Sequence, residues 1–318
     1  MKLLIALLTL CCATLAHAHP GNGIVVAPDG TVYFADVARE TIWKLSPDGD
    51  LTPLVRDTWT HCLYLAPDGT LYYEREEPAE GVAPCSFWRI TPDGQRERVI
   101  APQRDRRNFA GAEFAVDGEG NVYYAHSRRD ADRQWRARIM RRTPAGEITE
   151  FTGRGRGPLF TDGDPDAATI RIVTAMAMGP EGAIYFADRD HVRRVELTGE
   201  RAGHVATITS DLIDERPKDS PNRSGPSTTI NRIYGLAIDD QRRPIVAYQA
   251  GRRVVRISAD GTNREVVRRT PGRWSPLGVA TRGHDVYVLE CGDATIEQLR
   301  VIKISADGKA ETLAELGG

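Results

Sequence analysis

Polar side chains that can bind ligands or exchange protons stand at the ends of short apolar segments along this 318-residue chain. One set lies at or just before the start of such a segment, namely Asn22, His61, Asn108, Thr174, Asn231 and Tyr234. A second set closes the segment that follows, namely Asp36, Glu74, His126, Asp188, Tyr248 and Glu290. Imidazole and carboxylate groups transfer protons or bind metals, and amides and hydroxyls orient a ligand. Their chemistry depends on whether the fold brings them together.

Three histidine and glutamate residues form one possible metal site. Cleavage after Ala18 would leave His19 as the first residue, so that its free amine and imidazole could chelate one ion together. With His61 and Glu290 added, such a donor set suits copper or zinc. The alternative is that no metal binds. Chain ends are often frayed, so His19 would not be held in place, and His61 would be an ordinary rim histidine.

A second metal motif lies in residues 162–166, where Asp162, Asp164 and Asp166 alternate as in the start of a calcium loop. A calcium loop of that kind also needs a bidentate glutamate further along the chain, and this segment lacks one at the required spacing. The segment therefore favours an ordinary loop over a calcium site.

The apolar segments belong to a repeated unit. The first unit has strand-like residues 24–26, 32–36 and 42–45, with turns Pro28-Asp29-Gly30 and Pro47-Asp48-Gly49 between and after them. Five further units follow, with first turns at 67–69, 118–120, 180–182, 240–242 and 282–284 and second turns at 92–94, 144–146, 198–200, 259–261 and 306–308. Asp-Gly suits tight hairpins because glycine adopts positive φ at no steric cost.

Six units of this kind predict an all-β fold, a six-bladed β-propeller of four-stranded antiparallel sheets. Residues 19–318 are expected to form it as a single domain. In a propeller, the connections between blades and those between second and third strands share one face, here called the top face. The first set of polar residues would ring the axis on that face, with Gly111 or Glu113 and Pro276 completing it. The second set would lie one strand further out, about 5 Å away. A funnel with this many polar side chains is the expected ligand site.

The fourth unit resembles an NHL repeat from Phe151-Thr152-Gly153, through residues 162–164 and 175–177, to residues 184–188. The first two units are similar to it. This resemblance implies the propeller superfamily of SMP-30/gluconolactonase-like hydrolases, strictosidine-synthase-like enzymes, amidating lyases and binding modules. Its lactonases hold one divalent cation on the axis with a Glu, one or two Asn and an Asp. The matching positions here are Asn22, Thr174 and Tyr234, which supply little of that charge.

The first 18 residues have the pattern of a signal peptide: Lys2, an apolar run over residues 3–15, and Ala16-His17-Ala18. The expected location is therefore periplasmic or secreted. No later segment is long and apolar enough for a membrane span. The net charge of −2 gives no support for binding nucleic acid.

Three cysteines remain after the leader: Cys62, Cys85 and Cys291. We predict that Cys62 and Cys85 lie on one face of the second blade, close enough to bridge. Idle or buried thiols are the alternative.

The sequence as a whole favours an exported NHL-type propeller that binds a small molecule or a protein partner on its top face. The alternative is a metal-dependent hydrolase or lyase, gluconolactonase-like or amidating-lyase-like, that uses the same face. No cofactor is certain, although a divalent ion (copper, zinc or calcium) fits the enzyme alternative.

Overall fold

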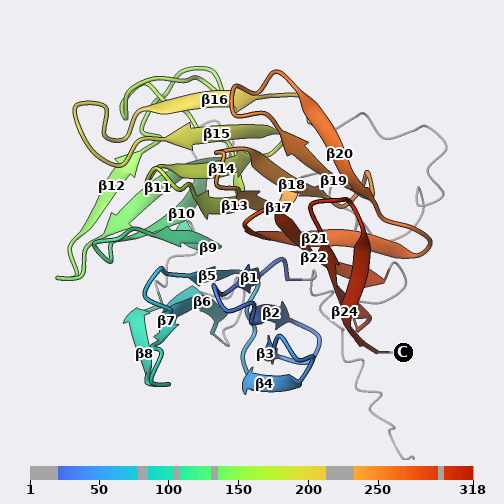
Figure 1. Ribbon diagram of the computed structural model, residues 1–318. Helices are drawn as coiled ribbons and strands as arrows, with labels where there is room; N and C mark the ends of the chain where they lie inside the picture. Colours follow the sequence, from blue (N-terminus) through green and yellow to red (C-terminus); the bar gives the residue numbers. More distant parts are fainter. Residues whose placement is uncertain are drawn as a thin grey trace, which may run out of the picture.

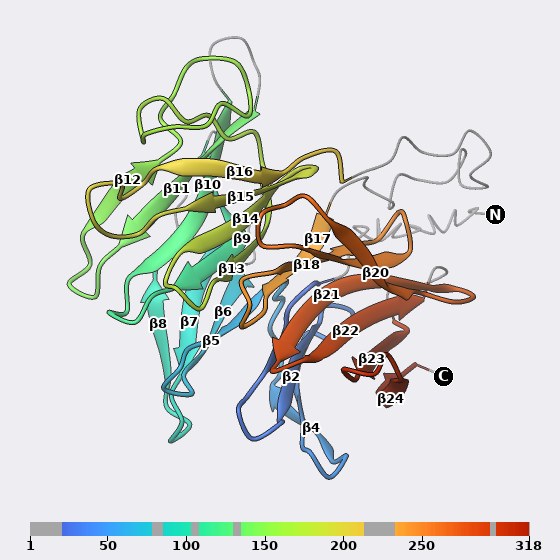
Figure 2. The same cartoon turned by 45° about the horizontal axis from the view of Figure 1, so that its top comes forward.

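The computed structural model describes residues 21–77, 85–102, 108–129, 135–212, 233–292 and 297–317. Within them the regular structure is entirely β, with six four-stranded antiparallel sheets arranged in a ring. Figure 1 shows the ring along its axis, and Figure 2 shows it tilted. The predicted six-bladed β-propeller is confirmed.

Each blade consists of four consecutive strands, ordered from the axis outward. Blade one contains β1 (Ile24–Val26), β2 (Val32–Asp36), β3 (Thr41–Leu45) and β4 (Leu51–Val55). Blade two contains β5 (Leu63–Leu65), β6 (Leu71–Glu76), β7 (Cys85–Ile90) and β8 (Arg96–Ile100). Blade three contains β9 (Asn108–Val116), β10 (Val122–Arg129), β11 (Trp135–Arg142) and β12 (Ile148–Thr152).

The second half of the ring repeats this order. Blade four contains β13 (Val173–Met178), β14 (Ile184–Asp188), β15 (His191–Val195) and β16 (Val205–Thr209). Blade five contains β17 (Ile233–Ile238), β18 (Pro244–Tyr248), β19 (Arg253–Ile257) and β20 (Arg264–Arg269). Blade six contains β21 (Trp274–Arg282), β22 (Asp285–Gly292), β23 (Leu299–Ile304) and β24 (Ala310–Leu316).

The turns between first and second strands have the geometry that the sequence predicts. Gly30 and Gly69 have φ of 97° and 85°, in the left-handed region that glycine tolerates. The fifth turn lacks a glycine, and there Arg242 adopts a φ of 58°. The hairpin therefore forms even where its preferred residue is missing, because the strands on either side fix it.

The ring closes by side-chain packing between blade one and blade six, since each sheet takes all its strands from one stretch of chain. In Figures 1 and 2 the blue first blade lies beside the red sixth blade. Phe34 and Leu45 of blade one share a buried cluster with Leu277, Leu289 and Val301 of blade six. Burial of such side chains contributes about 1.5–3 kcal/mol each, which makes this cluster the main closure of the ring.

Close to the axis, glycines let neighbouring first strands approach one another. A Cβ on Gly278 would lie 2.0 Å from the carbonyl oxygen of Asn22, and a Cβ on Gly235 would lie 2.7 Å from that of Leu277. Neither space admits a side chain without movement of backbone. These contacts set the narrow diameter of the channel.

Bulges in the first strands re-aim the residues that ring the axis. The register of β13 with β14 shifts between Val173 and Ala175, and that of β17 with β18 shifts between Ile233 and Gly235. The extra residues are Thr174 and Tyr234. Bulges often redirect a side chain next to a functional site.

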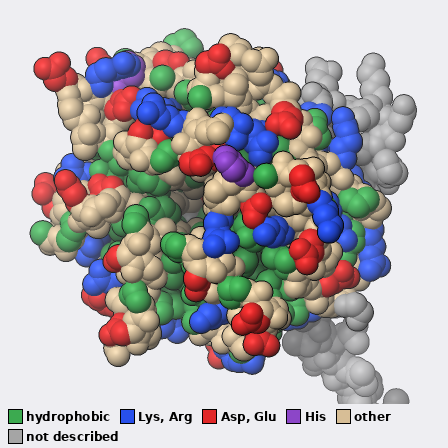
Figure 3. All heavy atoms as spheres, in the orientation of Figure 1, with side chains coloured by type: hydrophobic (Ala, Val, Ile, Leu, Met, Phe, Trp, Pro, Cys, Tyr) green, Lys and Arg blue, Asp and Glu red, His purple; other side chains and the backbone are tan. Residues whose placement is uncertain are grey.

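Charged side chains of both signs are mixed over the face that Figure 3 shows, with no large area of one sign. No helix in the described part of the chain is long and apolar enough to cross a membrane.

Candidate functional site

A small cavity of about 40 Å³ lies on the axis, and all six blades contribute to its wall. One residue from each blade illustrates this: Asn22, Cys62, Phe114, Ala175, Gly235 and Val279. A volume of this size holds water molecules but no larger ligand. This part of the axis, as the described residues line it, is therefore narrow.

Asn22 crosses the top of this cavity and links three blades. Its amide Nδ2 donates to the backbone carbonyl oxygen of Tyr234 in blade five. Its Oδ1 accepts from the thiol of Cys62 in blade two at 3.2 Å. Both ends of the Asn22 amide are thus engaged by protein groups.

His61 and Glu74 form a buried pair at the top of blade two. Glu74 is the last residue in the buried part of β6, and its side chain is fully buried. Its Oε1 accepts from the backbone N–H of His61 at 2.5 Å and lies 3.1 Å from His61 Nδ1. A carboxylate at Nδ1 fixes the ring orientation and places the proton of the neutral imidazole on that nitrogen.

Four more ionisable side chains surround this pair. Glu76 lies two residues after Glu74 on the same face of β6, with an oxygen 3.8 Å from His61 Nδ1. Cys85 stands opposite Glu76 in the register of β6 and β7. Cys62 follows His61, and the charge of Glu113 from β9 acts on both thiols and on His61. We call His61, Cys62, Glu74, Glu76, Cys85 and Glu113 the blade-two site.

The pKa values of the blade-two site reflect burial among negative charges. Burial alone lowers the pKa of His61, but the hydrogen bond and charge of Glu74, with Glu76 and Glu113, raise it above the ordinary 6.5. Burial raises the pKa of Glu76, although the His61 imidazole opposes this. Burial and the carboxylates raise the pKa of the Cys62 and Cys85 thiols well above the ordinary value. The site therefore favours protons or other cations.

Glu74 differs from the carboxylates at the matching place in other blades. In blade one, Asp36 accepts from Arg39 Nη1 at 3.0 Å. In blade six, Glu290 accepts from Arg268 at 2.6 Å and Arg300 at 2.7 Å. Those acids have arginine counter-ions.

Glu74, in contrast, has no arginine or lysine partner among the described residues, and His61 is its only counter-ion. Its second oxygen, Oε2, is buried and accepts no hydrogen bond from them. A buried acceptor left in this state costs free energy. The carboxylate of blade two is thus incompletely compensated.

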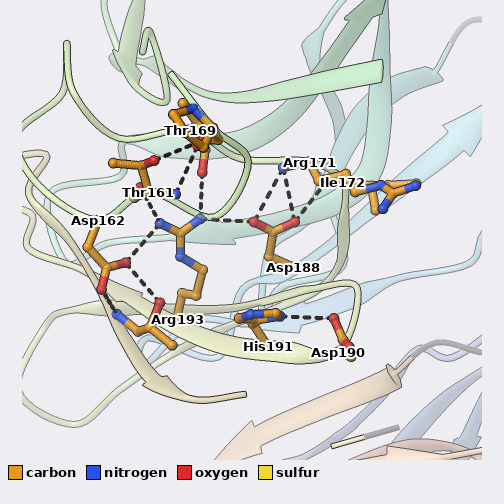
Figure 4. A network of polar contacts seen from close by, with 11 residues as sticks. Thr161, Asp162, Thr169, Arg171, Ile172, Asp188, Asp190, His191 and Arg193 are labelled. Atoms are coloured by element: carbon orange, nitrogen blue, oxygen red, sulfur yellow. Dashed lines mark hydrogen bonds and ion pairs between the residues drawn. The ribbon is translucent and has the colours of Figure 1, made fainter. Parts of the chain in front are cut away.

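In blade four the matching acid, Asp188, belongs to a buried network around Arg193 (Figure 4). The fully buried Arg193 donates to Asp188 at 2.9 Å and to Asp162 at 2.9 Å. It also donates to the carbonyl oxygens of Thr161 and Thr169, at 2.7 and 2.6 Å. This network attaches the long connection between β12 and β13 to blade four.

The aspartates of residues 162–166 are all paired within the protein. Asp162 accepts from Arg193 and from Thr207, Asp164 lies 2.9 Å from His204 Nδ1, and Asp166 accepts from Arg154. These contacts give each of the three carboxylates its own partners within the protein. They do not converge on one point between the three side chains.

The other predicted site residues lie apart from the blade-two site or outside the described residues. Glu290 lies between blades five and six with its arginines, and the structure shows no contact that joins it to His61. Tyr248 is buried under Arg253, whose guanidinium is 5.3 Å from the ring centre. His126 is half-buried and stands opposite Arg138 in the register of β10 and β11. Thr174 Oγ1 is buried and has no partner among the described residues. His19, Asn231 and the side chain of Asn108 lie outside what the structure describes.

The described residues do not fit a metal ion. They contain no group of three or more His, Cys, Asp or Glu side chains arranged to hold one. On the axis, Asn22 is occupied by Tyr234 and Cys62, and the bulged Thr174 adds only a hydroxyl. Calcium prefers several carboxylate or carbonyl oxygens, which this part of the ring does not offer.

Cys62, Cys85 and Cys291 form no disulfide, so Cys62 and Cys85 are not bridged. Cys62 instead donates to Asn22. Glu76, Cys62 and Glu113 were not expected to act with His61 and Glu74. Glu76 had a detectable signal, since residues two apart on a strand share a face. Cys62 is the neighbour of His61 in the chain. Glu113 approaches His61 through the packing of blades two and three.

The fold is similar to that of solved enzymes and binding proteins. Virginiamycin B lyase from Staphylococcus aureus matches with a TM-score of 0.52 and 16% identity, covering 92% of this chain and 84% of the lyase. Regucalcin from Agrobacterium tumefaciens, a calcium-binding protein, matches with a TM-score of 0.56 and 15% identity, covering 85% and 82%. A gluconolactonase from Xanthomonas campestris matches with a TM-score of 0.56 and 12% identity, covering 85% and 83%.

The likeness is one of fold. Identities this low do not transfer an activity, because one propeller fold supports many functions. No protein-family model and no curated protein sequence matches this chain.

Proposed function

We propose that this chain is an exported six-bladed propeller that binds a small molecule on its top face, at the blade-two site. The observation that supports this proposal is the state of Glu74. It is fully buried and, among the described residues, it has only a histidine as counter-ion and keeps one oxygen without a donor. The matching acids of blades one, four and six have arginine partners. A purely structural Glu74 would gain from the same arrangement.

A small molecule suits this site better than a protein partner. The acceptor groups of Glu74 lie below the surface, and Glu76 keeps 27% of its side chain exposed. A flat protein surface would reach Glu76 but not the buried oxygen behind it. The proposed function requires a ligand with a narrow polar group, which would pair with Glu76 and approach the buried carboxylate behind it.

A binding screen tests this proposal. The mature chain, with Glu74→Gln and Glu290→Gln variants, would be screened by thermal shift against a library of amines, acids, sugars and lactones. We expect at least one compound to stabilise the wild type and the Glu290→Gln protein more than the Glu74→Gln protein. If every stabilising compound acts equally on all three, the ligand site lies elsewhere.

Acid–base catalysis is a second candidate function, favoured by the His61–Glu74 geometry. A carboxylate at Nδ1 orients an imidazole for proton transfer through Nε2. A hydrolase or lyase of this type would work through side chains alone. Turnover of chromogenic esters and lactones by wild type and by His61→Gln checks it, because loss of the imidazole should remove the activity. Equal turnover in the two proteins would contradict an acid–base role.

We also propose that the protein is exported to the periplasm or secreted after loss of residues 1–18. The support is the leader pattern of Lys2, the apolar run and Ala16-His17-Ala18. Intact mass of the protein expressed with its own leader in a bacterial host should correspond to a chain that begins at His19. A mass equal to the full 318 residues would contradict export by this route.

A further inference from the structure

The charges of Glu74 and Glu76 are not balanced by a lysine or arginine among the described residues. Glu74 and Glu76 have His61 as their common counter-ion, with its Nδ1 at 3.1 and 3.8 Å. No lysine or arginine among the described residues pairs with either acid. The field of Glu113 adds a third negative charge to the same region. With one imidazole between Glu74 and Glu76, this pair of acids repels anions.

Blade six shows what completes such an arrangement. Glu290 is buried like Glu74, and there two guanidinium groups and the Thr270 hydroxyl donate to its oxygens. The comparison identifies what Glu74 and Glu76 lack, which is a group that is both positively charged and a hydrogen-bond donor. Cations of this kind bind carboxylates through short, charge-assisted hydrogen bonds.

We propose that the ligand of the blade-two site has a positively charged ammonium group, which pairs with Glu76 and is held by the charge of Glu74 behind it. This inference rests on the proposed ligand-binding function and names its ligand class. Glu76 is the entrance, because its side chain is partly exposed, whereas Glu74 is fully buried. An ammonium group donates up to three hydrogen bonds, which matches a site rich in acceptors.

The geometry favours an organic ammonium group over a metal ion. A transition metal needs three or more donor atoms at about 2.0–2.3 Å in a fixed arrangement. The described side chains provide no such group. An ammonium group needs only acceptors at hydrogen-bond distance and negative potential, and both are present. The buried oxygen of Glu74 accepts no hydrogen bond from the described residues, so its negative charge can act on an ammonium group held at Glu76.

Calorimetric titration of the mature full chain with 1,4-diaminobutane tests this inference, with 1,4-butanediol as a neutral probe of the same length. We expect the diamine to bind and the diol not to bind. Glu76→Gln and Glu74→Gln should each weaken the diamine by about tenfold or more, which corresponds to about 1.4 kcal/mol. Glu97→Gln is the matched control, because Glu97 is an exposed acid of the same blade that pairs with Arg89. It should bind the diamine as the wild type does.

Each other outcome separates this inference from the proposed function. Equal binding of diamine by wild type and Glu76→Gln overturns the assignment of the ammonium site. Stoichiometric binding of Zn²⁺ without binding of diamine overturns the ligand class in favour of a metal. If library compounds without a positive charge bind at Glu74 while the diamine does not, the inference fails and the proposed function stands. If a Gln variant fails to fold by near-UV circular dichroism, Glu113→Gln serves in its place, with the same expected weakening.

Discussion

At the scale of single residues, one position of the repeat shows how similar side chains acquire different roles. Asp36, Asp188 and Glu290 stand at or near the ends of the second strands of their blades and pair with arginine. Glu74 occupies the same place and pairs with His61. An arginine keeps its charge at any ordinary pH, whereas the charge of a histidine depends on pH. The blade-two site is therefore the titratable member of the series.

The first prediction concerns pH and His61, which faces Glu74 and Glu76 on β6 and the charge of Glu113 on β9. The pKa of His61 is raised above its ordinary value of 6.5 in the folded protein. The contribution of the His61 imidazolium to stability is therefore complete below pH 6.5. The contribution is lost as pH rises through the folded pKa. We expect the stability advantage of wild type over His61→Gln, measured by urea unfolding, to shrink as pH rises from about 5.5 to about 9.

The raised pKa of Glu76 also lowers the stability of the folded protein as pH rises, because the folded state favours the protonated carboxyl group. The pH series should therefore be repeated in the Glu76→Gln background, where the slope becomes smaller. A difference between wild type and His61→Gln that grows with pH would contradict this description of the site.

The second prediction concerns the Arg193 network. Arg193→Met would leave Asp188 buried without its counter-ion and would detach Thr161 and Thr169. Removing one partner of a buried pair costs about 3–5 kcal/mol. Arg194→Met is the control, because the adjacent Arg194 is partly exposed and pairs with Glu181 and Glu196. It should cost about 1 kcal/mol or less, and equal losses in urea unfolding would show that the buried network is not special.

At the scale of elements, the site depends on how first strands pack around the axis. The bulges in β13 and β17 insert Thr174 and Tyr234 as extra residues at the start of these first strands. Gly278 allows β21 to approach Asn22, and Asn22 in turn holds Tyr234 and Cys62. The contact between blades six and one thus extends into the residues beside the blade-two site.

The third prediction follows from this contact. In Gly278→Ala the new methyl group would lie 2.0 Å from the Asn22 carbonyl oxygen, so β1 and β21 must separate. Overpacking of this kind costs about 1–3 kcal/mol. The thermal midpoint should fall, and hydrogen exchange at the amides of Asn22 and Gly23, which donate to His61 O, should become faster. Gly182→Ala has open space around its Cβ but a positive φ, so it should lower the midpoint without changing exchange at Asn22.

The sequence predicts the elements of this fold better than their contacts. Turn spacing and strand alternation place six blades and both sets of polar residues, because these are local properties. The pairing of Glu290 with Arg268 joins the outer strand of blade five to blade six, and no spacing along the chain indicates it. His61 and Glu74 were expected on separate rings, whereas the structure joins them by a hydrogen bond. Residue types alone cannot show which acids have counter-ions.

At the scale of the whole molecule, the propeller closes by packing between blades one and six. In its described part, Glu74 and Glu76 have a single histidine as their common counter-ion. Side chains at a ligand site often stabilise the fold less than other residues at the same positions would, because function limits their optimisation. Glu74 fits this description and Glu290 does not. The contrast gives a measurement that needs no knowledge of the ligand.

The free energy of unfolding of Glu74→Gln and Glu290→Gln, measured in urea at about pH 8.5 without ligand, tests the central claim most directly. A glutamine at position 74 still accepts the hydrogen bonds from His61 and removes an uncompensated charge, so we expect no loss of stability. Glutamine at position 290 leaves Arg268 and Arg300 without a carboxylate, and we expect a loss of about 3–5 kcal/mol. If Glu74→Gln loses as much stability as Glu290→Gln, Glu74 is a structural residue and the blade-two site is not a ligand site.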